Sequence, residues 1–210
     1  MLAYAGNYYP TVQIGTQCWV ARNLDIGSVV TATSVPDTSC SSIQKFCYNN
    51  EASNCAAFGG LYTWPQAMCG AQAESAQGIC PSGWHIPSDP EFVTLVNYLG
   101  PGGCSSYPGG NYPAESFCGA PAGDRMKASG LCQGRTPCGD SGFNVLLSGA
   151  FGYDSGPVFS RIGNQGSFWT SSVTGDEAWR RGVALDYSGV DGSYFWTKIT
   201  GGRSIRCVKD

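Results

Sequence analysis

The side chains that could do chemistry in this sequence are its 11 cysteines and its single histidine, His85. Cysteine thiolates either bind zinc or form disulfides. A cysteine zinc site needs Cys-x2-Cys pairs or several histidines close by, and this chain has no Cys-x2-Cys pair. The cysteines therefore favour a disulfide framework, which predicts an oxidising compartment: secreted, periplasmic or cell-surface. Because 11 is an odd number, at least one thiol is free or pairs with another chain.

Most cysteines fall in loops rich in Gly, Pro and Ser, and their spacing suggests how those loops are closed. The run 100–121 is too long for a structureless loop in a compact domain unless a disulfide holds it. A short polar run between two cysteines, as at 48–54, would form a small closed loop. The candidate pairs are Cys18–Cys40, Cys47–Cys55, Cys104–Cys118 and Cys132–Cys138.

Catalytic chemistry finds little support in the sequence. His85 is the only imidazole base, and it stands just before a predicted capped helix, so we expect it to make structural hydrogen bonds. The 15 acidic residues show no spacing that singles out a catalytic carboxylate pair. We therefore expect no catalytic residue, no enzyme activity, no metal centre and no cofactor. A structural calcium ion held by loop carbonyls and Asp side chains remains open.

Charge is sparse, and this limits the partners. Charged residues make up 13% of the chain, with a net charge of −3, so there is no basic field for nucleic acid. No apolar run is long enough to cross a membrane. The chain begins like the mature part of a longer protein, so we expect any membrane attachment to come from a missing N-terminal anchor. Six Trp and 11 Tyr residues are typical of an extracellular β-rich module.

Two helices are predicted from capping signals. Thr63 caps a helix that starts within 61–68. The stronger signal spans 89–99, where Ser88 and Glu91 form a capping box ahead of an apolar residue at every third or fourth position. One further helical turn is expected at 125–128.

Alternating apolar and polar residues predict strands at both ends of the chain. An N-terminal hairpin and a C-terminal strand would meet in one sheet, and the helices lie between them in sequence. This order predicts an α+β fold, organised as a single domain over residues 1–210, with 27–57 mostly loop. The expected strands are 11–14, 18–21, 143–147, 168–172, 179–187, 194–199 and 204–208.

A patch of aromatic and small polar residues lies in the C-terminal strands, 167–210. Tyr and Trp offer large, rigid contact area with a polar tip, while Ser and Gly adapt around them, as in antibody paratopes. Successive strand residues point to opposite faces, so at least one aromatic residue of 194–196 should face outward or lie at a sheet edge. Arg180 and Arg181 are expected to be a solvated pair, the alternative being that one of them stacks on Trp169 or Trp179. The candidate ligand-binding residues are Trp169, Tyr187, Ser188, Asp191, Ser193, Tyr194, Phe195, Trp196 and Thr197.

Several short motifs, taken in order, resemble those of a known family. Their residues and order identify the chain as a member of the Fibrobacter succinogenes major paralogous domain family, from about residue 12 to the end. The resemblance implies a C-type lectin-like fold, in the branch shared with formylglycine-generating enzymes, with two helices, curved antiparallel sheets and long disulfide-stapled loops. The motifs are QCWVARNL at 17–24, CYNN at 47–50, GLYTW at 60–64, GICPSGWHIPSD at 78–89, GFNVL at 142–146, SFWTSS at 167–172 and SIRCVKD at 204–210.

Within this resemblance, Cys207 of the last motif is expected to pair with Cys80 of the fourth. A formylglycine-type oxidase would need a reactive cysteine pair in the C-terminal half, and Cys207 is the only cysteine after Cys138. That spacing argues against such an enzyme. The motifs by which C-type lectins bind sugar through calcium are also absent. The Gly/Cys-rich insert 100–141 is the part that the family pattern covers least.

A narrower resemblance concerns the C-terminal strands. Residues 178–181, 185–188 and the last motif are similar to variable regions of proteins diversified by retroelements, whose changed side chains occupy a ligand face. This resemblance implies that 187–197 is the hypervariable part. Two functions then follow. One is a secreted or cell-surface module that binds a protein or glycan without chemistry. The other is a self-associating structural subunit, pilin-like or adhesin-like, of a surface filament.

Overall fold

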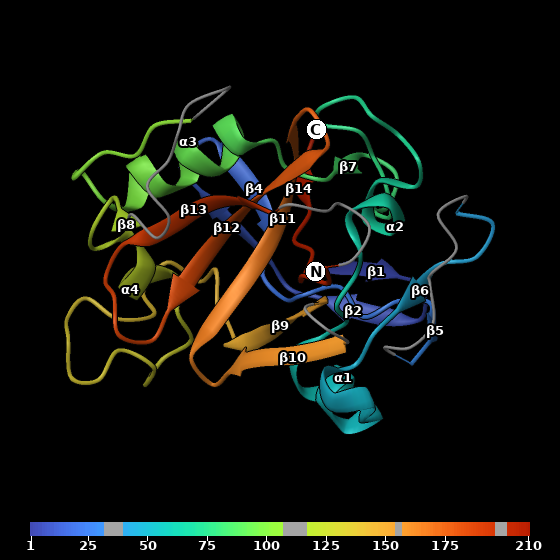
Figure 1. The fold of residues 1–210 in the computed structure, drawn as a ribbon. Helices are drawn as coiled ribbons and strands as arrows, with labels where there is room; N and C mark the ends of the chain where they lie inside the picture. Colours follow the sequence, from blue (N-terminus) through green and yellow to red (C-terminus); the bar gives the residue numbers. More distant parts are fainter. Residues whose placement is uncertain (32–39, 107–116, 154–156, 196–200) are drawn as a thin grey trace.

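The computed structural model describes residues 1–31, 40–106, 117–153, 157–195 and 201–210 (Figure 1). Its regular structure is mostly β-strand, with four α-helices and one 3-10 turn in the described part. This composition places the chain in the expected α+β class. The helical elements are η1 (Tyr48–Asn50), α1 (Ala52–Phe58), α2 (Trp64–Met68), α3 (Asp89–Leu99) and α4 (Ala122–Met126).

The predicted N-terminal hairpin and the end of the chain lie in one four-stranded sheet, as expected. Its strand order is β3-β4-β14-β7, and Val208 pairs with Trp19 on one side and His85 on the other. The strand expected at 204–208 is regular only at its end, and Ser204 before it makes a single bridge. The strands are β3 (Thr11–Ile14), β4 (Gln17–Val20), β7 (Trp84–His85) and β14 (Val208–Lys209).

A six-stranded sheet of order β10-β9-β11-β12-β13-β8 carries the C-terminal half of the chain. Its neighbours are antiparallel except β9 and β11, which pair in parallel at Gly149 and Gly166. Two further sheets of two strands each pair β1 (Leu2–Tyr4) with β2 (Asn7–Tyr9) and β5 (Ser28–Val29) with β6 (Gln44–Lys45). The strands of the large sheet are β8 (Phe117–Cys118), β9 (Ser148–Tyr153), β10 (Pro157–Ile162), β11 (Gln165–Thr174), β12 (Glu177–Ala184) and β13 (Val190–Phe195).

Some strand predictions were wrong in their limits. The run 143–147 lies before β9 and is not a strand, because Gly142 and Asn144 have positive φ angles of 74° and 58° that interrupt an extended chain. The strand expected at 179–187 already ends at Ala184. The strand expected at 194–199 begins earlier, as β13, and its residues after 195 lie outside the described part.

The helices follow their capping signals where such signals exist. Ser88 and Glu91 form the predicted capping box of α3, and Thr63 caps α2. Helix α1 falls inside the expected loop 27–57, and its sequence ASNCAAF has no apolar stripe that would have predicted it. Helix α4 starts before the turn expected at 125–128. The described part therefore holds four α-helices, where two were implied.

The core lies on both faces of the large sheet. Phe168 and Trp169 are neighbours on β11, both fully buried, and they point to opposite faces. Phe168 packs with Phe92 of α3 and with Phe143, while Trp169 packs in the cluster that contains Trp64 of α2. In Figure 1, α3 lies on one side of the molecule, and α2 lies on the side of the small sheets. Each face of β11 is thus covered.

Disulfides hold the long loops to these layers. Four of the five pairs agree with the candidates named from the sequence. The Cys18–Cys40 pair was wrong: Cys40 bonds Cys69 at the end of α2, and Cys18 is free. Cys18 lies on β4 opposite Gln13, in the middle of the hairpin. The five pairs are Cys40–Cys69, Cys47–Cys55, Cys80–Cys207, Cys104–Cys118 and Cys132–Cys138.

Candidate ligand-binding site

Tyr187 is the predicted ligand-binding residue that the structure exposes most clearly, with 52% of its surface accessible. It lies in the turn between β12 and β13, where Ser188 is half-buried. The ring of Tyr187 stacks on Phe117 of β8, with ring centroids 3.9 Å apart and planes inclined by 9°. Phe117 was not predicted as a site residue. It lies within the Gly/Cys-rich insert 100–141, and its partner lies 70 positions away in sequence.

Other predicted residues of this face lie in or beyond β13. Ser193, Tyr194 and Phe195 pair in register with Arg180, Trp179 and Ala178 of β12, and their side chains lie outside the described part. The predictions for Trp196 and Thr197 also fall outside it. Whether 194–196 presents an aromatic side chain to solvent therefore stays a prediction.

Trp169 was wrongly placed on the binding face. Its side chain is completely buried, and its Nε1 donates a hydrogen bond of 2.8 Å to the carbonyl oxygen of Tyr62. Arg203 lies over the ring, with its guanidinium carbon 5.4 Å from the centroid. These contacts make Trp169 part of the core beneath the sheet.

Asp191 is a site candidate that turns out to be buried, with 1% of its surface exposed. Its Oδ2 accepts hydrogen bonds from Arg180 Nη1 at 2.8 Å and from Gln165 Nε2 at 3.2 Å. Its Oδ1 has no hydrogen-bond partner among the described residues. Burying a carboxylate in this way requires a compensating cation, and Arg180 supplies it.

The expectation that Arg180 and Arg181 form a solvated pair was wrong. Arg180 is 7% exposed and bonds Asp191, while Arg181 is 0% exposed and bonds Asp89 of α3. Adjacent residues of a strand point to opposite faces, so the two arginines hold β12 to different neighbours. Sequence alone shows two adjacent charges, and only the fold supplies their acidic partners.

A pocket of about 210 Å³ opens beside Tyr187. We call it the Tyr187 pocket. It brings the stacked aromatic pair together with Asp191 and with polar residues at the start of β11 and the end of β10. Arg161 Nη1 donates to Gln165 Oε1 at 2.9 Å, and Gln165 in turn donates to Asp191. The lining residues are Phe117, Arg161, Asn164, Gln165, Ala184, Asp186, Tyr187 and Asp191.

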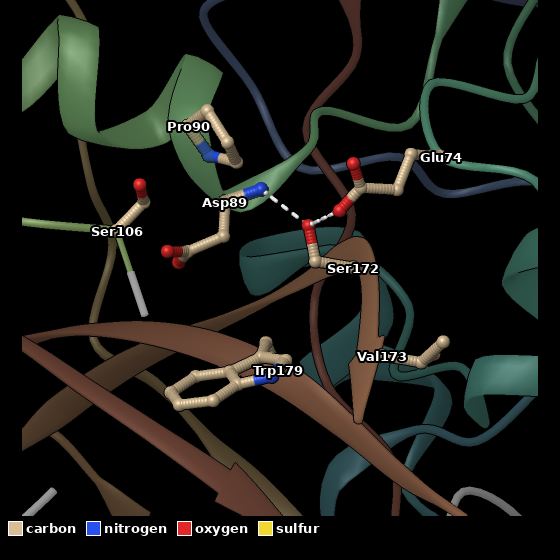
Figure 2. A pocket seen from close by; sticks show the side chains of 7 residues that line it. All are labelled: Glu74, Asp89, Pro90, Ser106, Ser172, Val173 and Trp179. Atoms are coloured by element: carbon tan, nitrogen blue, oxygen red, sulfur yellow. Dashed lines mark hydrogen bonds between the residues drawn. The ribbon is translucent and has the colours of Figure 1, made fainter. Parts of the chain in front are cut away.

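A second pocket, of about 150 Å³, lies between the start of α3, the end of β11 and the start of β12 (Figure 2). Ser172 Oγ accepts a hydrogen bond from the backbone N–H of Asp89 at 2.8 Å and donates to the carboxylate of Glu74. Trp179 forms the apolar wall, and its Nε1 donates to Thr174 Oγ1 at 2.9 Å. In Figure 2, Ser172 thus connects the backbone N–H of Asp89 to the carboxylate of Glu74.

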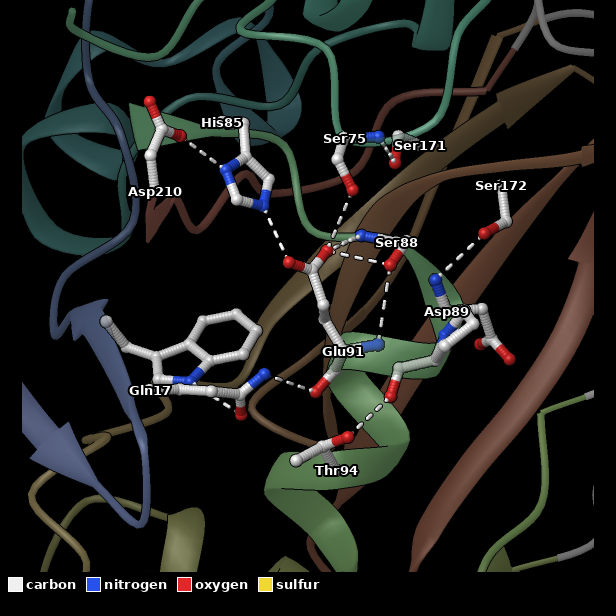
Figure 3. Close-up of polar contacts among 12 residues, drawn as sticks. Gln17, Ser75, His85, Ser88, Asp89, Glu91, Thr94, Ser171, Ser172 and Asp210 are labelled. Carbon is white, nitrogen blue, oxygen red and sulfur yellow. Dashed lines mark hydrogen bonds and ion pairs between the residues drawn. The ribbon is translucent and has the colours of Figure 1, made fainter. Parts of the chain in front are cut away.

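His85 makes the structural hydrogen bonds expected of it (Figure 3). Its Nε2 lies 2.8 Å from Glu91 Oε1 and its Nδ1 lies 2.7 Å from Asp210 Oδ1. The bond to Glu91 raises the pKa of His85 and outweighs the opposing effect of burial. Burial alone would raise the pKa of Glu91, but hydrogen bonds from His85 and Ser88 lower it to about 2. This network joins β7, α3 and the end of the chain.

The described residues contain no group of three or more His, Cys, Asp and Glu side chains that could hold a metal ion. Within the same ranges, no helix has the length and apolar character needed to cross a membrane.

These features define a disulfide-rich α+β domain with an exposed tyrosine, stacked on a partly buried phenylalanine, beside a polar pocket. The Fibrobacter succinogenes major domain model matches residues 12–209, and the chain belongs to that family, as its motifs indicated. No curated protein and no solved structure matches the chain.

Proposed function

We propose that the protein is a non-catalytic ligand-binding module, secreted or displayed at a cell surface, whose binding face surrounds Tyr187 and β13. The observation that carries the proposal is the stacked pair of Tyr187 and Phe117 at the rim of the Tyr187 pocket. A half-exposed aromatic ring such as Tyr187, held in place by a stacked partner, offers large contact area at little cost in side-chain entropy. The ligand is a protein or a glycan.

A rigid base supports this face. Phe117 precedes Cys118, which bonds Cys104, and Cys118 pairs with Val190 of β13. Lys127, fully buried, donates from Nζ to the carbonyl oxygens of Leu185 and Tyr187 at 3.1 and 2.9 Å. The turn that carries Tyr187 is thereby fixed from beneath, which favours binding because little chain entropy is lost.

The fold proposed for this base is C-type lectin-like. The pairing of β14 with β4 brings the end of the chain against the N-terminal hairpin. In sequence, loops closed by the disulfides Cys104–Cys118 and Cys132–Cys138 follow the last two helices. The more specific proposal is that residues 187–197 are diversified by a retroelement. Such diversification would vary Tyr187 and the residues of β13 while the buried Arg181–Asp89 pair beneath them stayed constant.

An extracellular location and the absence of catalysis are parts of the same proposal. Five disulfides favour an oxidising compartment. A net charge of −3 gives no support to nucleic-acid binding. His85, the single imidazole, is 8% exposed and occupied at both ring nitrogens by carboxylates. A general base needs a free nitrogen within reach of substrate.

Binding can be measured on immobilised fibrinogen, collagen, mucin and a set of neutral, acidic and amino-sugar polysaccharides by biolayer interferometry. We expect at least one of these surfaces to bind the wild type and to lose most binding with Tyr187→Ala. Tyr98→Ala is the matched control, because Tyr98 is also exposed, at 66%, but lies on α3 against the hairpin turn at Gly15. Mass spectrometry should find the bound material chemically unchanged.

Full binding by Tyr187→Ala, or chemical change of the bound material, would overturn the proposal. Regular self-assembly that buries Tyr187, measured by analytical ultracentrifugation and lost in Tyr187→Ala, would instead establish the alternative of a structural filament subunit.

A further inference from the structure

We infer that the Tyr187 pocket binds one sugar unit of a neutral saccharide without a metal ion, an inference that rests on the proposed function. The pocket combines an aromatic wall, a buried hydrogen-bond acceptor and a balanced set of charges. Each of these narrows the class of ligand, and together they favour an uncharged, hydroxyl-rich molecule.

The aromatic wall supplies a flat apolar surface. One face of the Tyr187 ring is covered by Phe117 at 3.9 Å, so the 52% of Tyr187 that is exposed belongs to its other face and its edge. Sugar rings carry apolar C–H groups on one face, which pack on a flat aromatic ring. Pockets of this kind use apolar area for contact and a few polar groups for orientation.

The acceptor is Asp191 Oδ1. The Asp191 carboxylate is 1% exposed and lines the pocket, and its Oδ2 is held by Arg180 and Gln165. Oδ1 has no partner among the described residues. A buried acceptor without a donor is unfavourable, and a ligand hydroxyl that reached Oδ1 would satisfy it. Gln165 is itself oriented by Arg161, so the acceptor is fixed before the ligand arrives.

The charges around the pocket disfavour an ionic ligand. Arg180 already neutralises Asp191 at 2.8 Å, and Arg161 lines the pocket, so a cation would meet the Arg161 guanidinium and would find the Asp191 charge already paired. An anion would meet Asp191 and the exposed Asp186. Like charges brought together at an interface cost affinity. An uncharged ligand whose hydroxyl group donates a hydrogen bond avoids both penalties.

The volume sets the size of the bound unit. At about 210 Å³ the pocket is smaller than the roughly 300–1,000 Å³ typical of sites that enclose drug-sized ligands. It therefore suits one sugar ring of a longer chain that continues over the exposed surface at Tyr187.

The test is an NMR titration of the full chain, with backbone amides as reporters. Cellotriose, maltotriose and N,N′,N″-triacetylchitotriose are the neutral probes. Trigalacturonate and chitosan trimer are the anionic and cationic ones. We expect at least one neutral trimer to shift the amides of Ala184 and Asp191, with an affinity about tenfold or more above that of either charged trimer.

Three substitutions separate stacking from folding. Tyr187→Ala should lower the affinity for the neutral trimer by about tenfold or more. Tyr187→Phe keeps the ring, so its affinity, like that of Tyr98→Ala, should stay within about threefold of wild type. Preference for a charged trimer, shifts confined to other regions, or unchanged affinity in Tyr187→Ala would overturn the inference.

The outcome also separates this inference from the proposed function. If Tyr187→Ala abolishes binding to a protein surface while no neutral trimer binds, the proposed function stands and the saccharide assignment falls. If neither set of probes gives binding that depends on Tyr187, both fall.

Discussion

Arg181 of β12 and Asp89 of α3 form a two-point ion pair, with Nε 2.6 Å from Oδ1 and Nη2 2.7 Å from Oδ2. Both side chains are buried, Arg181 completely. Charges removed from water in this way are tolerated only while each has its partner. The pair therefore fastens the start of α3 to the large sheet, on the face opposite to the Tyr187 pocket.

Removing one member of this pair should be strongly destabilising. We expect Arg181→Met to lower the free energy of unfolding by about 3–5 kcal/mol, because Asp89 is left buried and unpaired. Asp140→Asn is the control, since Asp140 forms only an exposed pair with Arg125 at 3.9 Å and should lose less than about 1 kcal/mol. Urea denaturation followed by circular dichroism measures both. Equal losses would contradict the role given to Arg181.

The disulfides should differ in their effect according to the loops they close. Cys80–Cys207 spans a sequence separation of 127, and Cys132–Cys138 spans 6. Chain-entropy arguments then give about 5 kcal/mol for the long loop and about 2 kcal/mol for the short one. Replacing each pair by alanine and measuring unfolding without reductant tests the order. A larger loss from the short loop would show that unfolded-chain entropy is not the main term.

His85 should make folding stability depend on pH. The hydrogen bond to Glu91 raises the His85 pKa above its usual 6.5, so its contribution is full below about pH 6.5 and is lost as the pH rises through the raised pKa. The Glu91 pKa is lowered from 4.5 to about 2, so its contribution is full above pH 4.5 and is lost as the pH falls toward 2. The stability due to this pair is therefore greatest between about pH 4.5 and pH 6.5.

The measurement is urea unfolding of wild type and His85→Gln between pH 4 and pH 9. The difference in stability between the two proteins isolates the histidine from the other titrating groups. We expect this difference to shrink by about 1 kcal/mol or more above pH 7. A difference that is constant across the range would show that the His85 pKa is the same in the folded and the unfolded protein, and so is not raised.

Elements with local signals could be predicted from the sequence. The capping box at Ser88 and Glu91 and the apolar stripe behind it define α3, because all the interactions involved lie within one helix. Helix α1 was missed because it is short, has no side-chain cap and lacks an apolar stripe. Its own Cys55 bonds Cys47, which lies before the helix, so part of the constraint on α1 comes from outside the helix.

The candidate site could be predicted only in part, for a related reason. Tyr187 stands out by type, but Phe117, Gln165 and Arg161 become its neighbours only when the large sheet forms. Burial was harder still to predict. Both faces of β11 are covered, so alternation along SFWTSS does not distinguish core from surface, and Trp169 was assigned to the wrong class.

Trp169 and Tyr187, both expected to bind ligand, should respond differently to truncation. Trp169 is fully buried and its indole bonds Tyr62, so Trp169→Ala should lower the free energy of unfolding by about 3–5 kcal/mol. Tyr187 is half exposed and loses mainly its stacking on Phe117, about 0.5–1.5 kcal/mol. Urea denaturation of both variants tests this ranking. If Trp169→Ala kept the stability of wild type, its ring would not be core, and Trp169 would return to the binding face.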